Sequence, residues 1–245
     1  GGHTFGKAHG AGDPALVGRI AGERAVARLG GRKVKTGEFP VLFEAPLAGG
    51  LLGSLVHAAS GGALYRKSSF LLDQLGKRVM PEFVNISERP HITRGLGSAA
   101  FDSDGVATRD REVVSGGILQ GYFLSAYTGR KLGMQTTGNA GGSHNLIIEP
   151  GALDFAGLLA RMGRGLLVTE LLGQGVNYVT GDYSRGAAGY WVENGMIAYP
   201  VEEITIAGNL KAMLAGIVAV GNDVQVRGSK QTGSILIDRM TIAGE

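Results

Sequence analysis

The 245-residue chain contains no cysteine, which excludes a disulfide framework and any metal site built on thiolates. No apolar run approaches the roughly 18 residues of a membrane-spanning helix, so we expect no membrane partner. Proline is scarce, with 7 residues against 43 glycines, and the glycines follow no repeat that would indicate collagen. These absences are typical of a globular protein, and the lack of disulfides suits the cytoplasm.

Charge of one sign is not concentrated anywhere in the sequence. The 24 basic and 21 acidic residues give a net charge of +3, and the basic residues are dispersed. A nucleic-acid-binding protein more often carries a concentrated basic patch with interleaved aromatic residues. We therefore expect no nucleic-acid partner.

Glycine lies mostly within apolar, alternating sequence, a pattern that predicts many turns and a β-rich domain. The strongest hairpin signal is Asn194-Gly195, between strand-like segments at 190–192 and 196–199. A second hairpin is expected between 109–114 and 118–127, around a glycine turn. We predict an α+β fold with mainly antiparallel β sheets and a few packing helices. Further strands are expected at 39–45, 165–172, 204–207 and 234–237, and helices at 13–30, 46–61, 154–162 and over about ten residues from Asn209.

The N-terminal segment, residues 1–18, differs from the rest of the chain. Its first twelve residues, GGHTFGKAHGAG, resemble the segment of catalase-peroxidases that carries the proximal haem histidine, and this resemblance would make His3 the axial ligand. A haem site also needs a distal histidine and arginine in a helical pocket, and nothing downstream resembles those parts. We expect residues 1–18 to be a foreign-looking segment without haem, with a haem peroxidase fragment as the weaker alternative.

The remaining residues, 19–245, contain several segments that, in order, resemble the C-terminal domain of the TldD/TldE (PmbA) metallopeptidase family. The longest is GQGVNYVTGDYSRGAAGYWVENG at residues 173–195. The family's N-terminal domain is absent, and the chain begins at Gly1 without a signal peptide, so we expect a fragment or processed half of a subunit. The other matching segments are residues 65–77, 101–106, 138–142, 200–210 and 220–223.

Residues 53–66 resemble the active-site helix of the catalytic TldD subunit, which reads His-Glu-x-x-x-His. Only His57 matches, because Ala58 occupies the place of the glutamate and Gly62 that of the second histidine. A zinc protease needs several ligands, and a carboxylate to take a proton from the bound water. The resemblance therefore implies a degenerate motif, with no catalytic residue and no metal site in this chain.

The resemblance implies a specific biological role, the non-catalytic TldE subunit. TldD and TldE form a cytoplasmic heterodimer that degrades or processes unfolded peptides. The TldD-like partner supplies zinc through two histidines and a cysteine, so zinc is expected in the partner and no cofactor in this chain. Whether this chain is itself an enzyme stays open.

Peptide binding is the function that remains for such a subunit. We expect Gly173, Gly175 and the glycine-rich run 181–189 to let a peptide backbone approach closely, as in the addition of a strand to a sheet edge. Asp182 and Arg185 could orient a substrate terminus or brace their loop, and paired loop charges more often brace.

The main alternative is an independently active metal-dependent peptidase. Its candidate ligands lie in separate segments with no close spacing, so the sequence gives no reason to bring them together. They are His57, His91, His144, Asp102, Asp104 and Glu149.

Overall fold

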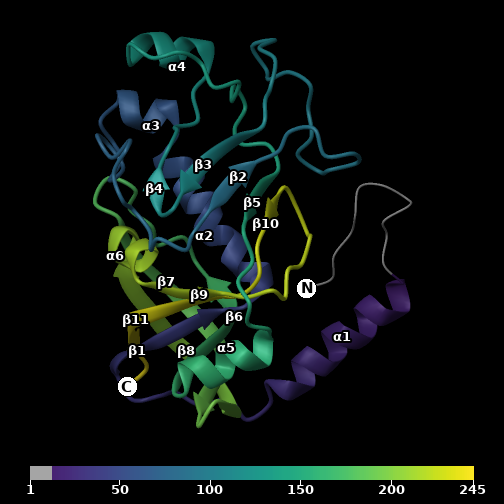
Figure 1. The fold of residues 1–245 in the computed structure, drawn as a ribbon. Coiled ribbons are helices and arrows are strands. Elements are labelled where there is room, and N and C mark those ends of the chain that lie inside the picture. Colours follow the sequence, from purple (N-terminus) through teal and green to yellow (C-terminus); the bar gives the residue numbers. More distant parts are fainter. Residues whose placement is uncertain (1–12) are drawn as a thin grey trace.

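The computed structural model describes residues 13–245 and contains two β sheets, with helices between and around them (Figure 1). The expected α+β class is confirmed. In chain order the elements are α1 (Pro14–Ala27), β1 (Gly37–Phe43), α2 (Ala45–Ala58), α3 (Gly61–Tyr65), β2 (Ile86–Glu88), β3 (Arg111–Ser115), β4 (Ile118–Leu119), α4 (Ala126–Lys131), β5 (Leu146–Ile148), α5 (Phe155–Met162), β6 (Gly165–Leu172), β7 (Asp182–Glu193), β8 (Met196–Asn209), α6 (Leu210–Ala215), β9 (Ile217–Val220), β10 (Lys230–Gln231) and β11 (Ile235–Ala243).

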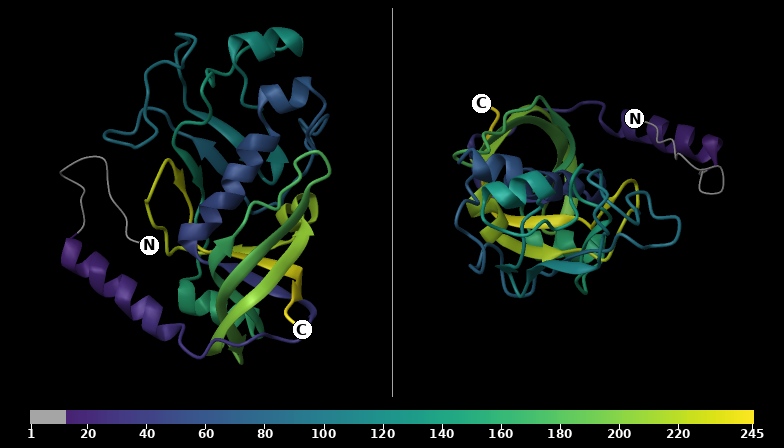
Figure 2. Two further views of the ribbon diagram at one scale, coloured as in Figure 1. Left: turned by 180° about the vertical axis from the view of Figure 1, so that it is seen from behind. Right: turned by 90° about the horizontal axis from the view of Figure 1, so that it is seen from above.

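The larger sheet has the strand order β1-β6-β7-β8-β11-β9 and closes on itself, because β1 also pairs with β11. The β1–β6 pairing is parallel and the others are antiparallel. The right-hand view of Figure 2 shows this curled sheet from above. The smaller sheet has the order β10-β5-β2-β3-β4, in which only β10 and β5 run parallel.

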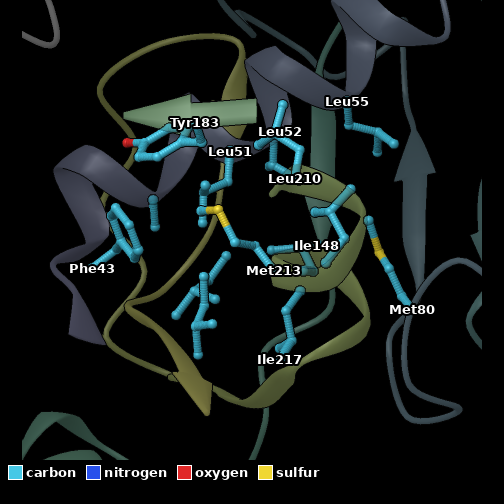
Figure 3. Close-up of a cluster of buried hydrophobic side chains, with 14 of the residues drawn as sticks. Phe43, Leu51, Leu52, Leu55, Met80, Ile148, Tyr183, Leu210, Met213 and Ile217 are labelled. Carbon is cyan, nitrogen blue, oxygen red and sulfur yellow. The ribbon is translucent and has the colours of Figure 1, made fainter. Parts of the chain in front are cut away.

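Helix α2 lies between the two sheets and joins their cores (Figure 1). Its Leu51, Leu52 and Leu55 are at most 4% exposed and pack in one cluster with residues of both sheets, as Figure 3 shows. Complete burial of one such side chain stabilises a fold by about 1.5–3 kcal/mol. The apolar face of α2 therefore fixes how the two sheets sit against each other.

A second apolar cluster lies on the outer face of the curled sheet, under α5. Leu158, Leu159 and Met162 of α5 pack there against residues of β1, β6, β7 and β11. Asp154 begins the helix by accepting a hydrogen bond from the Gly157 amide, and Gly163, with φ +67°, ends it. This helix confirms the expectation for residues 154–162.

In the middle of the chain, one sequence-based expectation is partly confirmed and another is wrong. The helix expected over 46–61 breaks after Ala58, and α3 begins at Gly61 with Ser60 as its cap. The strand expected over 118–127 ends at Leu119, because Phe123 instead exchanges backbone hydrogen bonds with the helix break. A serine-threonine capping box then begins α4, which no pattern had indicated.

The expectations near the two ends of the chain are partly confirmed. Helix α1 is continuous across residues 18 and 19, so the structure shows no break at the expected boundary, and His3 lies outside the described residues. None of its residues is buried, and ion pairs of Arg24 with Glu44 and of Arg28 with Glu170 connect it to the rest. The helix expected from Asn209 has only six residues, Leu210–Ala215.

Within residues 13–245, no helix is both long enough and apolar enough to cross a membrane.

Candidate functional site

The only donor left from the family's metal motif, His57, lies in the last turn of α2 with an exposed side chain. Its ring stacks on Tyr178, from the segment between β6 and β7, with centroids 4.0 Å apart and an interplanar angle of 29°. The imidazole therefore covers an aromatic ring of the neighbouring segment.

The two other motif positions have structural neighbours that fit an alanine and a glycine. Ala58 is 0% exposed, and its carbonyl accepts a hydrogen bond from Ser69 Oγ at 2.5 Å. Gly62 lies on α3, beyond the helix break, and a Cβ there would come within 3.4 Å of the Arg66 guanidinium. Because neither position offers a donor atom, the residues at this place do not fit a metal ion.

The two other histidines considered as ligands make hydrogen bonds within their own region of the fold. His91 Nε2 lies 3.0 Å from Thr108 Oγ1, and His144 Nε2 lies 2.9 Å from the Gly138 carbonyl. Among residues 13–245, no three His, Cys, Asp or Glu side chains lie close enough together to hold a metal ion.

The three candidate carboxylates are also engaged locally. Asp102 is 5% exposed, and three backbone N–H groups donate to it. Burial opposes its ionisation, but these bonds still hold the pKa of Asp102 below its usual value. Asp104 accepts from the Ala126 amide at 2.9 Å, and Glu149 accepts from Asn85 Nδ2 at 2.8 Å. These groups brace loops.

A cavity of about 390 Å³ lies beside α2, between this helix and the segment that joins β6 to β7. Glycines and a serine of α2 form one side, and the start of β7 contributes Tyr183 and Arg185, which point to the same face of the strand. The lining residues are Phe43, Leu47, Gly50, Leu51, Gly53, Ser54, Leu171, Gln174, Val176, Tyr178, Tyr183 and Arg185. None of them is acidic.

Arg185 is the only charged residue in the cavity lining, and its charge is not neutralised. Its Nε atom is shielded from solvent without a hydrogen-bond partner, and no carboxylate among residues 13–245 forms an ion pair with it. The guanidinium hydrogen-bonds the Tyr183 hydroxyl. Burial raises the pKa of Tyr183, and Arg185 offsets part of this rise.

The structure separates the two charges that the sequence analysis considered as a pair. Asp182 and Arg185 are three residues apart on one strand, so their side chains point to opposite faces. Asp182 accepts hydrogen bonds from Thr180 Oγ1 at 2.6 Å and from Asn209 Nδ2 at 3.3 Å. Asp182 braces its own loop, and Arg185 alone faces the cavity.

Of the two single glycines expected to admit a peptide, Gly175 is engaged with neighbouring backbone, whereas Gly173 has open space around the position of a Cβ. A Cβ on Gly175 would lie 1.7 Å from the Ser184 carbonyl oxygen, so this glycine permits close contact with β7. The run 181–189 lies almost entirely within β7, which pairs with β8 on one side and, on the other, with the segment 175–177 as far as Ser184 and with β6 from Gly186 onward. This run is therefore closed to strand addition.

An unpaired strand edge lies nearby, on β6, and sequence reasoning missed it. Pairing between β1 and β6 ends at Phe43 and Val168, because the chain then turns into α2. Residues 170–172 continue to pair with β7 after a register shift at residue 169, and no strand among the described residues pairs with the other side of residues 169–172. This edge leads to Leu171 and Gln174 in the cavity lining.

Residues 36–244 match the family described as the PmbA/TldA metallopeptidase C-terminal domain. A metalloprotease PmbA homolog of Haemophilus influenzae is 55% identical over 232 residues, which cover 94% of this chain and 51% of that protein. Metalloprotease PmbA of Escherichia coli O157:H7 is 53% identical, with 95% and 52% covered. The chain thus spans about half the length of these curated relatives.

Solved structures show the same fold. A putative modulator of DNA gyrase from Bacteroides thetaiotaomicron superposes with a TM-score of 0.92 at 31% identity, covering 97% of this chain and 54% of that one. TldE from Thermococcus kodakarensis has a TM-score of 0.81 at 24% identity, covering 94% and 55%.

Proposed function

Because the chain belongs to the PmbA/TldD metallopeptidase family, we propose that its residues 19–245 serve as the non-catalytic, peptide-binding part of a cytoplasmic TldD/TldE-type complex. Its partner is a TldD-like subunit that carries zinc and cleaves unfolded peptides. The observation that carries the proposal is that only one of the three metal-motif positions has a side chain able to bind a metal ion. One exposed imidazole, His57, faces an aromatic ring, while Ala58 is completely buried and Gly62 lies on a separate helix.

The motif has too few metal-binding side chains for a catalytic zinc site. Catalytic zinc sites use three protein ligands and leave a fourth position for water, which a general base then deprotonates. His57 alone cannot provide this arrangement. The buried environment of Ala58 also opposes a carboxylate, since an ionised group there would lose its hydration without gaining a partner.

The unpaired edge of β6 supports a role in peptide binding. Residues 169–172 present backbone groups on one side, and an extended peptide can pair with such an edge largely independently of its sequence. Most backbone N–H and C=O groups of a folded protein are already paired, so this mode favours unfolded substrates. The edge replaces the closed run 181–189 as the place where we propose that a peptide adds.

The test is to co-express the chain with a TldD-like partner and to measure zinc content and peptidase activity for each protein alone and for the pair. We expect zinc only in the partner. The His57→Ala variant of this chain should leave the activity of the pair unchanged, whereas substitution of the partner's motif histidines should abolish it.

The same experiment decides against the proposal if the isolated chain binds one zinc ion tightly and cleaves an unfolded peptide, and a chelator stops the cleavage. That result would favour the alternative, an independently active metal-dependent peptidase. Loss of activity on His57→Ala would also count against a non-catalytic role.

A further inference from the structure

We propose that the cavity beside Arg185 binds a carboxylate of the peptide, either its free C-terminal carboxylate or an aspartate or glutamate side chain. The inference rests on the proposed peptide-binding function and adds a chemical preference to it. Three separate features of the cavity support this inference: an uncompensated cation, the composition of the lining, and the position of the cavity beside the unpaired edge of β6.

The uncompensated cation is the first feature. A guanidinium that loses hydration normally gains a carboxylate or several hydrogen bonds, because burial of an unpaired charge is costly. Arg185 Nε is shielded without a partner, and the cavity lining contains no acid. The nearest acidic residue along the strand, Asp182, faces the opposite side and bonds Thr180. A carboxylate from outside would supply the missing partner in two parallel hydrogen bonds.

The lining is the second feature. A volume of about 390 Å³ lies within the range of ligand sites and exceeds what one carboxylate needs. Phe43, Leu47 and Leu171 make much of the wall apolar, which strengthens a charge-assisted hydrogen bond inside. The Tyr183 hydroxyl accepts from Arg185 and stays protonated at neutral pH, so its own proton is free to donate to the same ligand.

The location is the third feature. Leu171, on the unpaired part of β6, and Gln174, just beyond that strand, both line the cavity. A peptide that pairs with residues 169–172 would therefore run along the cavity. Alternate side chains of an extended peptide point to one face, so either its last residue or an acidic side chain could reach Arg185.

The experiment measures binding of fluorescently labelled peptides to the full chain by anisotropy. Three peptides share one sequence of uncharged residues: a free acid, a C-terminal amide, and an amide with one internal glutamate. Charge-assisted hydrogen bonds predict that the free acid, the glutamate peptide or both bind about 10-fold to 100-fold more tightly than the plain amide. The peptide that gains affinity identifies the source of the carboxylate.

Variants connect this preference to the cavity. Arg185→Gln should abolish the preference for a carboxylate and leave the affinity for the plain amide unchanged. Arg185→Lys should keep part of the preference for a carboxylate, because lysine retains the positive charge but cannot form a bidentate pair of hydrogen bonds. Arg109→Gln, at an exposed arginine that is not part of the cavity lining, is the matched control and should behave like the wild type.

The outcomes separate the inference from the function on which it rests. Equal affinity for all three peptides, or a carboxylate preference that survives in Arg185→Gln, overturns the cavity assignment and leaves peptide binding intact. If no peptide binds, the proposed function fails, and a thermal shift with millimolar N-acetylglycine against N-acetylglycinamide then tests the cavity alone. Stabilisation of the wild type, but not of Arg185→Gln, by the acid only would support it; no difference would overturn it.

Discussion

Ala58→Glu, which restores the glutamate of the family motif, should strongly destabilise the fold. Ala58 is 0% exposed in the core between α2 and the sheets. The longer side chain overpacks the site at a cost of about 1–3 kcal/mol. Burial of a carboxyl group without a partner adds about 1–3 kcal/mol. The loss of about 2–6 kcal/mol is a large share of the 5–15 kcal/mol that is typical of a domain.

The pH dependence of this loss follows from burial. Burial raises the pKa of the introduced carboxyl above its unfolded value, so the folded state binds more protons. The loss should be smallest below the unfolded pKa, about 4.3, and should grow as the pH rises through the folded pKa. Urea unfolding followed by circular dichroism at pH 4.5 and pH 7.5 measures both the size and the direction.

Two controls make the test decisive. Ala58→Gln has nearly the same shape but does not ionise, so its loss should not depend on pH. Gly62→His, at the third motif position, meets only the flexible Arg66 side chain and should change stability by about 0.5 kcal/mol or less. An Ala58→Glu variant that unfolds at the same urea concentration as the wild type would refute the argument that core packing has replaced the catalytic base.

Three further predictions test other parts of the structure. Arg185→Met keeps the stem but removes the charge and the unpaired Nε, so it should raise the free energy of unfolding by about 1 kcal/mol in thermal denaturation. A lower melting temperature would show that the bond to the Tyr183 hydroxyl outweighs the cost of the shielded Nε. Gly175→Ala places a Cβ 1.7 Å from the Ser184 carbonyl oxygen and should lower the free energy of unfolding in urea by at least about 3 kcal/mol. Gly173→Ala, at φ +74° in open space, should lower it by about 1–2 kcal/mol. Backbone hydrogen bonds lower the folded pKa of Asp102, so its contribution to the free energy of unfolding is present above the unfolded pKa and is lost as the pH falls through the folded pKa. Asp102→Asn should therefore flatten the acid side of the curve of stability against pH, measured by urea titrations between pH 2 and pH 6.

Signals carried by a few adjacent residues predicted their structure well. Asn194 and Gly195 both adopt positive φ, 52° and 73°, in the turn between β7 and β8, as the Asn-Gly signal requires. Asp154 begins α5 and Gly163 ends it. In each case the interactions that decide the conformation lie within a few residues, so the sequence holds them all.

Pairings between distant segments decided what the local patterns could not. Residues 120–127 have strand-like composition, yet Phe123 bonds to the helix break at residues 59–61. The amide of Ala45, at the start of α2, is capped by Ser234 Oγ from the far end of the chain, and Ser234 in turn bonds Asp223. The sequence of residues 45–58 therefore could not predict that cap.

The sequence by itself determined that Ala58 and Gly62 occupy two positions of the resembled His-Glu-x-x-x-His motif, because a side chain missing from a motif position is a matter of sequence and no fold can supply it. Only the tertiary structure decided which surfaces remain for a peptide. Pairing of β7 with β6, with β8 and with the segment 175–177 closes the run 181–189, while the turn of the chain from β1 into α2 leaves one side of residues 169–172 unpaired. The physical reason is that strand edges and the surroundings of a charge are defined by neighbours distant in the sequence, such as those that leave the half-buried Arg185 facing a cavity without an anion.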